Sequence, residues 1–276
     1  MTGEGDMNGE KTTAQGERLR YLVQAFLQDS EGYAHLPVPP DEEGRRRLLR
    51  SLMNIRMPRE LPGDVLKIQD EYLTERAREK GVVTLAQIPV IRDGLSIWQG
   101  DITRLQVDAI VNAANAQMLG CFVPLHACID NCIHTFAGVQ LRAACDREMG
   151  RLRRKYGKGY EQPTAVPLLT DAYNLPARKV VHVVGPIVSG PLTAELEGEL
   201  ADCYANTLTL CAENELRSVA FCCISTGVFH FPNRRAAQIA VETVEGWLRA
   251  HRGQVDRVIF NVFKEEDRGY YEALIR

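Results

Sequence analysis

The spacing of hydrophobic residues changes near residue 91. Before that point, apolar residues recur every three to four positions in the segments 17–29, 41–55 and 62–80, which is the period of amphipathic helices. Asp41 is suited to cap the second helix. The third opens with Pro62 and Asp64 and ends before Gly81, as helix termini commonly do. The pattern predicts a helical N-terminal extension over residues 17–90.

From about residue 91, short apolar runs alternate with helical patterns. Strands are expected at 95–98, 107–111, 166–169, 180–184, 219–224 and 258–263, and helices at 129–149, 193–214, 233–251 and 265–275. Strands that alternate with helices indicate a mixed, mostly parallel sheet covered on both faces, so residues 91–276 should form a three-layer α/β/α domain. Ligands of such sheets bind beyond the carboxyl ends of the strands, and chemistry is expected there.

Composition limits the environment and the partners. The 276 residues carry a net charge of −3, which argues against broad electrostatic capture of nucleic acid or of an anionic membrane. No apolar run reaches the ~18 residues that span a bilayer. Residues 1–16 are polar and rich in Gly, Thr and Glu, so we expect a disordered tail without a signal peptide, and a cytoplasmic protein. Eight cysteines in that compartment indicate thiols or metal ligands rather than disulfides.

One short segment has the composition of a metal site. Cys121, His126 and Cys128 form C-x4-H-x-C, and two thiols with an imidazole are ligands that Zn²⁺ prefers. Three protein ligands leave a fourth position for water or substrate, as in catalytic sites. A fourth ligand such as Cys132 or His134 would make the site structural instead. From spacing alone, buried thiols beside a loop histidine explain the segment equally well.

Polar and small residues follow three of the expected strands. Backbone N–H groups at a strand-to-helix turn of Ser, Thr and Gly can bind phosphate oxygens, and amides or a carboxylate near other strand ends can bind ribose hydroxyls or a base. Each segment alone could equally be an ordinary polar turn, with Asp101 as a cap. The segments are Ser225-Thr226-Gly227-Val228-Phe229, Gly100-Asp101-Ile102-Thr103 and Val111-Asn112-Ala113-Ala114-Asn115.

In combination, these segments resemble the macrodomain, an ADP-ribose-binding α/β/α module. The resemblance runs from about residue 95 to 275 and includes four motifs in family order. They are Gly100-Asp101-Ile102-Thr103, Val111-Asn112-Ala113-Ala114-Asn115, Ile129-Asp130-Asn131-Cys132-Ile133-His134 and Ile224-Ser225-Thr226-Gly227-Val228-Phe229. Most macrodomains carry a glycine-rich loop after the asparagine motif. Here the segment with Cys121, His126 and Cys128 replaces it, and this looks like the zinc-dependent macrodomain subfamily, which also has a helical N-terminal extension.

The resemblance implies an activity, a cofactor and partners. Members of that subfamily resemble hydrolases that remove mono-ADP-ribose from proteins, and they are often associated with an ADP-ribosylating sirtuin and a lipoyl-carrier protein substrate. It implies one zinc ion per chain, held by Cys121, His126 and Cys128 at the distal ribose. There the ion could orient or polarise a ribose hydroxyl, or lower the pKa of bound water.

The resemblance also assigns roles to individual residues. Asp101 and the Ile102 backbone would hold adenine, Phe263 would line its face, and residues 225–229 would cradle the diphosphate. Asn112 would contact the ligand. Asn115 would contact the distal ribose as a catalytic residue, and Asp130 would act as the general base or would position a metal-bound water or hydroxyl. Phe263 could instead be a core residue at the end of an apolar strand, and His134 is expected to be structural.

Other functions remain open from sequence. A reader module would bind ADP-ribosylated protein without cleaving it, and a phosphatase or deacetylase would act on free derivatives such as O-acetyl-ADP-ribose. The N-terminal helices could pack against the domain, which we favour, or dock a carrier protein or partner enzyme.

Overall fold

The computed structural model describes residues 14–30 and 32–276. Most of the expected tail, residues 1–13, lies outside this part of the chain. Helix α1 (Ala14–Asp29) begins three residues earlier than the sequence predicted, so residues 14–16 belong to a helix.

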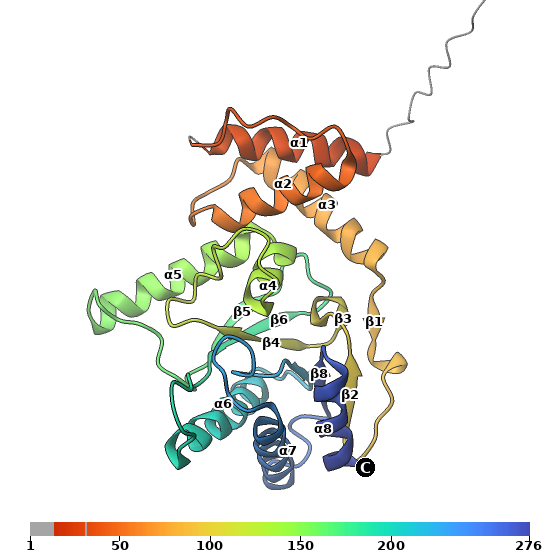
Figure 1. Cartoon of the computed structure of the whole chain (residues 1–276), viewed down its shortest axis with the longest axis vertical. Coiled ribbons are helices and arrows are strands. Elements are labelled where there is room, and N and C mark those ends of the chain that lie inside the picture. The colour runs from red at the N-terminus through yellow and green to blue at the C-terminus, as the bar shows by residue number, and fades with distance from the viewer. Residues whose placement is uncertain (1–13, 31) are drawn as a thin grey trace, which may run out of the picture.

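The three expected N-terminal helices are present and form a unit of their own. Helix α1 packs against α2 (Glu42–Ile55) and α3 (Gly63–Lys80), and the three stand together at one end of the molecule (Figure 1). Their apolar stripes enclose a separate core that includes Leu19, Phe26 and Leu52. Asp41 caps α2, as predicted, by accepting a hydrogen bond from the Gly44 amide. We call α1–α3 the helical unit.

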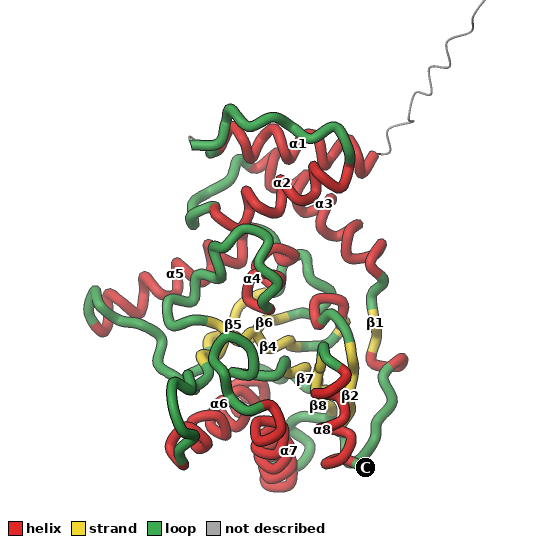
Figure 2. The backbone as a smooth tube through the Cα atoms, viewed as in Figure 1, coloured by secondary structure: helices red, strands yellow, loops and turns green. Residues whose placement is uncertain are grey.

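A short connection joins the helical unit to the second half of the chain. Strand β1 (Val83–Thr84) pairs in parallel with β3 (Leu105–Gln106), and a single 3₁₀ turn, η1 (Leu85–Gln87), follows β1. The tube in Figure 2 shows this segment running along one side of the sheet before the chain enters it.

A six-stranded mixed sheet forms the centre of the second half. Its order is β2-β8-β7-β4-β6-β5, and every pair is parallel except β5 with β6. The strands are β2 (Leu95–Gln99), β4 (Ala109–Ala114), β5 (Leu168–Asp171), β6 (Lys179–Val184), β7 (Ser218–Phe221) and β8 (Arg257–Val262). The expected three-layer α/β/α fold is confirmed.

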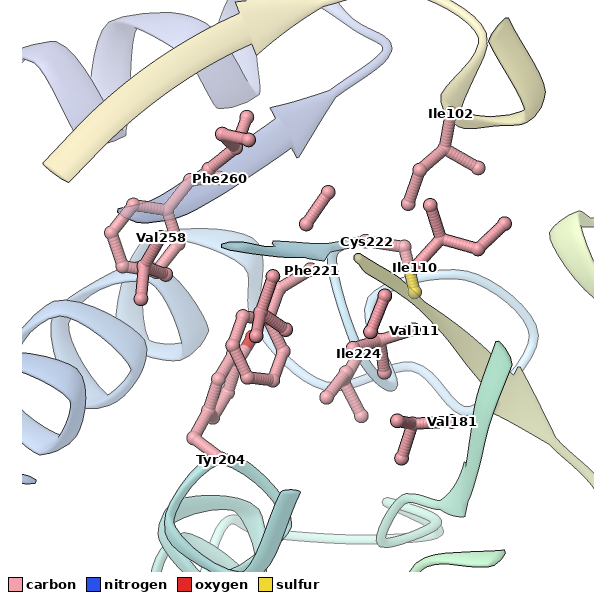
Figure 3. Close-up of a cluster of buried hydrophobic side chains, with 14 of the residues drawn as sticks. Ile102, Ile110, Val111, Val181, Tyr204, Phe221, Cys222, Ile224, Val258 and Phe260 are labelled. Carbon is pink, nitrogen blue, oxygen red and sulfur yellow. The ribbon is translucent and has the colours of Figure 1, made fainter. Parts of the chain in front are cut away.

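Helices cover both faces of the sheet. Helices α4 (Ile129–Ala137) and α5 (Val139–Tyr156) lie on the side facing the helical unit, and α6 (Ala194–Glu213), α7 (Asn233–Ala250) and α8 (Glu265–Ile275) lie on the other (Figure 1). Because both faces are buried, the central strands are mostly apolar. Figure 3 shows part of the resulting core, in which Tyr204 of α6 packs beneath Phe221 of β7, with ring centroids 4.9 Å apart.

Several element boundaries differ from the prediction, including one within a helix and two at strand ends. The single helix expected at 129–149 is two helices, because Gly138 adopts φ of +95° and starts a new axis. Strand β4 continues to Ala114, so Asn112 lies inside a strand and not in a turn. Strand β7 ends at Phe221, which leaves Cys222 and Cys223 in the segment after it.

Two further predictions can be compared with the structure. All eight cysteines are free thiols, as expected. In the described part of the chain, no helix is both long and apolar enough to cross a membrane.

Candidate functional site

The C-x4-H-x-C segment lies in an irregular loop between β4 and α4. Within this loop, which we define as residues 119–128 and call the metal loop, the Sγ of Cys121 is 3.4 Å from the Nδ1 of His126. The ligand atoms of Cys121, His126 and Cys128 all lie within 4.8 Å of one another. The backbone reaches this arrangement through two left-handed residues, Gly120 (φ +79°) and Leu125 (φ +58°).

The donor set fits zinc. Bonds of about 2.0–2.3 Å to a tetrahedral ion place ligand atoms roughly 3.5–3.8 Å apart, so small side-chain rotations would close the three residues around an ion. Burial raises the pKa of the Cys128 thiol to about 12, and a bound dication would reverse this preference and favour the thiolate. Within the described residues, neither Cys132 nor His134 joins the group, so the fourth-ligand alternative gains no support from the geometry.

Asp130 lies directly beside the metal loop in a buried position. Cys128 caps α4 by accepting a hydrogen bond from the Asn131 amide, which places Asp130 in the first turn of that helix. The Asp130 carboxylate accepts hydrogen bonds from Asn112 Nδ2 at 2.8 Å and from Asn115 Nδ2 at 3.3 Å. Burial raises the pKa of Asp130 to about 6, although the bond from Asn112 and the charge of Arg142 oppose the shift.

Asn115 and Asn112 occupy different positions. Asn115 is half-buried just after β4, and its amide also donates to the carbonyl of Gly120 in the metal loop. Asn112, predicted to contact ligand, is wholly buried and donates instead to Asp130, with His182 Nδ1 3.1 Å from the same nitrogen. In this structure its side chain contacts Asp130 of α4 from the buried side.

Two buried histidines lie behind Asp130. His134 Nε2 is 3.5 Å from Asp130 Oδ1, and within the described residues neither of its ring nitrogens has a hydrogen-bond partner. Burial lowers the pKa of His134 well below its usual value and that of His182 to about 3, so both rings are neutral. A Cβ at Gly120 would lie 2.8 Å from the His134 ring, so only glycine allows the metal loop to pass over it.

The segment 225–229 follows β7 and presents free backbone donors. In the part of the chain that the structure describes, the N–H groups of Gly227, Val228 and Phe229 donate to no protein acceptor. Ser225 has φ of +63°, and its buried Oγ also lacks a partner. A Cβ at Gly185, the residue after β6, would lie 2.1 Å from that Oγ, so glycine at this position allows the segment to approach the end of the strand. Unpaired amides in a tight turn are the arrangement that binds phosphate oxygens.

The third predicted segment lies at the edge of the sheet, after β2. Asp101 Oδ1 caps a 3₁₀ turn by accepting from the amide and hydroxyl of Thr103, which is the capping role that the sequence allowed. Its other oxygen, Oδ2, is 3.6 Å from Lys80 Nζ of α3. Ile102 is 1 % exposed, so only its backbone could contact a ligand. Phe263 is 78 % exposed and is not a core residue, which leaves its ring free to lie against a base.

Two asparagines that sequence reasoning missed hold these segments in place. Asn131 Nδ2 donates to the carbonyls of Cys121 and Val123, and Asn261 Nδ2 donates to the carbonyl of Gly100 at 2.9 Å. Asn261 is a lone amide in an otherwise apolar strand, a signal that could have identified it. Asn131 lies in a motif with several other polar residues, each of which could have a functional role, so the sequence did not distinguish it from its neighbours.

The sequence of this chain is similar to a known family and to several known proteins. A family model described as Macro domain matches residues 111–240. A protein-ADP-ribose hydrolase of Treponema medium is 48% identical over 265 residues, which cover 95% of this chain and 99% of that protein. A protein-ADP-ribose hydrolase of Staphylococcus aureus (strain MSSA476) is 40% identical over 257 residues, covering 92% of this chain and 94% of the relative. The similarity to both therefore includes the helical unit.

The fold of this chain is also similar to solved macrodomain structures. The structure of the Trypanosoma brucei macrodomain in complex with ADP-ribose superposes with a TM-score of 0.63 and 29% sequence identity, and covers 82% of this chain and 95% of that one. The Oceanobacillus iheyensis macrodomain with ADP superposes with a TM-score of 0.58 at 37% identity, over 67% of this chain and 92% of the other.

Proposed function

The chain belongs to the macro domain family, and from this premise we propose that it is a cytoplasmic, zinc-dependent hydrolase that removes mono-ADP-ribose from modified protein side chains. The observation that carries the proposal is the meeting of Cys121, His126 and Cys128 beside the buried carboxylate of Asp130. Plain binding of ADP-ribose needs neither three metal ligands nor a buried acid with a raised pKa.

The ends of the strands supply the binding contacts. The free amides of residues 227–229 bind the diphosphate, and the exposed ring of Phe263 lies against adenine. The Ile102 backbone and the Asp101 carboxylate hold the edge of the base. Asn115, which already bonds Asp130, orients the distal ribose. With ADP-ribose bound in this way, the bond between ribose and acceptor would lie next to the metal loop.

Asp130 moves the proton in this reaction. Cys121, His126 and Cys128 would hold one zinc ion, which would supply Lewis-acid charge at the distal ribose. The raised pKa of Asp130 brings its ionisation close to neutral pH, where a carboxylate can act as general base. Asp130 accepts a proton from the attacking water as the water oxygen bonds to the acyl carbon of the ester. When the bond between that carbon and the ribose oxygen breaks, Asp130 returns the proton to the ribose oxygen, and ADP-ribose and the unmodified side chain are released. Asn112 holds the Asp130 carboxylate in place from the buried side.

The proposal extends to the acceptor and the partners. We propose acidic side chains as acceptors, because an acyl ester is more easily attacked by an activated oxygen than an N- or O-glycosidic bond. A lipoyl-carrier protein is the proposed substrate, and an ADP-ribosylating sirtuin the proposed source of the modification. Both follow from the resemblance to the zinc-dependent subfamily.

The test combines zinc content with turnover. In Cys121→Ala and His126→Ala, zinc content and release of ADP-ribose from a modified protein should both be lost, while the circular dichroism of the folded domain is kept. Cys132→Ala is the matched control, because this half-buried thiol lies on the next helix turn outside the ligand group, and it should retain zinc and activity. Full turnover by protein verified to be free of zinc would refute the metal role.

The same experiment separates the alternatives. Tight binding of modified protein without release of ADP-ribose would identify a reader module. Turnover of O-acetyl-ADP-ribose alone would identify a hydrolase of free derivatives.

A further inference from the structure

Helix α2, which belongs to the helical unit, also contacts the metal loop. We propose that Asn54 and Arg50 of this helix are positioning residues of the metal centre, which fix the backbone on both sides of His126 and, through Asn131, the backbone of Cys121. This inference rests on the zinc site of the proposed function. It assigns part of the metal centre to the helical unit.

Asn54 holds the residue before His126. Its side chain is 1 % exposed, and its Oδ1 accepts a hydrogen bond from the Leu125 amide at 3.0 Å. Leu125 has φ of +58°, a conformation that costs a non-glycine residue about 1 kcal/mol or more and persists only where neighbours hold it. The Asn54 amide nitrogen donates to Thr135 Oγ1 at 2.8 Å, so its orientation is fixed by α4.

Arg50 holds the other side of the same ligand. Its Nη2 donates to the carbonyl of His126 at 2.8 Å and to Asn131 Oδ1 at 2.9 Å. The Asn131 nitrogen in turn donates to the carbonyls of Cys121 and Val123. Two side chains one helical turn apart on α2 therefore determine where two of the three ligands lie.

The metal loop has little regular structure of its own. Within residues 119–128, the described backbone–backbone hydrogen bonds include one, from the His126 amide to the Val123 carbonyl. A loop with so few backbone hydrogen bonds loses conformational entropy when it binds an ion, and this loss weakens binding. The loss is smaller when side chains from outside the loop already hold it in the conformation that binds the ion. Groups that orient metal ligands from outside commonly change metal affinity by 10–100-fold when they are removed.

The experiment measures zinc affinity independently of catalysis. The full-length protein is loaded with zinc and titrated with a chromogenic chelator, in the variants Asn54→Ala, Arg50→Ala and Arg50→Lys. Arg47→Ala is the matched control, because Arg47 is exposed on the same helix and its side chain makes none of the described contacts. ADP affinity by calorimetry and the melting temperature of the zinc-free protein report on general damage.

Asn54→Ala and Arg50→Ala should weaken zinc binding by about 10–100-fold, with unchanged ADP affinity. Arg50→Lys should recover part of the loss because one donor and the charge remain, and Arg47→Ala should match the parent. The proposal is overturned if Asn54→Ala and Arg50→Ala hold zinc as tightly as Arg47→Ala, or if zinc and ADP affinity fall together. It is also overturned, together with the metal site itself, if Cys121→Ala still binds zinc like the parent. Loss of zinc in Cys121→Ala with full retention in the α2 variants would refute the positioning role alone.

Discussion

Arg142 of α5 joins the macrodomain to the end of α2, and replacing it with methionine should destabilise this contact. The guanidinium is buried and donates to the carbonyls of Met53, Asn54 and Arg56 through Nη1 and to that of Leu119 through Nε. The carbonyls at the C-terminus of a helix have no partners within it, and a cation there also interacts favourably with the helix dipole. Methionine fills a similar volume but leaves these carbonyls unpaired.

Two opposing effects determine the size of the loss. Three N–H groups of a charged donor, at about 1.5–3 kcal/mol each, would give a loss of about 4.5–9 kcal/mol. Burial of the charge lowers the pKa of Arg142 from 12.5 to about 10. At 1.36 kcal/mol per pKa unit, burying the charge costs about 3 kcal/mol, and the methionine variant no longer has this cost. In the variant the buried carbonyls remain without donors, so the loss of the hydrogen bonds is larger than the gain from removing the buried charge. We expect Arg142→Met to lower the free energy of unfolding by about 3 kcal/mol.

Urea unfolding followed by two probes tests this value. Both tryptophans, Trp98 and Trp247, lie in the macrodomain, whereas far-ultraviolet circular dichroism also reports on the helical unit. In Arg142→Met the circular dichroism should begin to fall at a lower urea concentration than the fluorescence, because the helical unit loses a main attachment. Arg154→Met, an exposed arginine on the same helix, is the control and should stay within about 0.5 kcal/mol of the parent.

A loss below about 1 kcal/mol in Arg142→Met, with coincident transitions by the two probes, would refute the reasoning. It would mean that water replaces the guanidinium at the helix end without a significant change in free energy. Arg142 would then be one of several equivalent contacts between the two parts of the chain.

Three further results are expected. Phe263→Ala should weaken ADP binding by about 1–3 kcal/mol in calorimetry through loss of base stacking, and should leave the melting temperature unchanged because the ring is exposed; equal affinity would place adenine elsewhere. Gly185→Ala should displace the Ser225 segment and lower ADP affinity, and Gly185→Ala/Ser225→Gly should recover part of it; a single variant that binds like the parent would contradict the close approach. His182 has a folded pKa of about 3, below its unfolded value near 6.5, so its stabilising effect is present above pH 6.5 and is lost as pH falls, by about 2 kcal/mol at pH 5. Urea titrations should show a shallower loss in His182→Gln, and identical pH profiles would count against a buried neutral ring.

The sequence predicted most elements of the fold because burial leaves a periodic pattern in the chain. Strands such as β8 are apolar at successive positions, and α2 repeats every three to four residues, so both could be recognised without coordinates. The ends of the helices and strands were predicted less accurately than their existence. The apolar period of α4 continues into α5, and this continuity concealed the change of axis at Gly138.

The face of a strand on which a polar residue lies was harder to predict. Asn112 was expected to contact ligand because it follows an apolar run. Strand β4 continues past Asn112, so this side chain is buried and contacts the Asp130 carboxylate from behind. Asn115, just past the end of the strand, lies beside the metal loop as expected.

The sequence by itself determined the candidate ligands of the metal site, since Cys121, His126 and Cys128 lie within eight residues and chain connectivity keeps them near one another. Only the tertiary structure showed what holds that loop, because Arg50 contacts His126 across 76 residues and Arg142 contacts the end of α2 from another helix. Such contacts join a single side chain to a backbone carbonyl. They leave no periodicity in the sequence, and they exist only after the two cores have packed against each other.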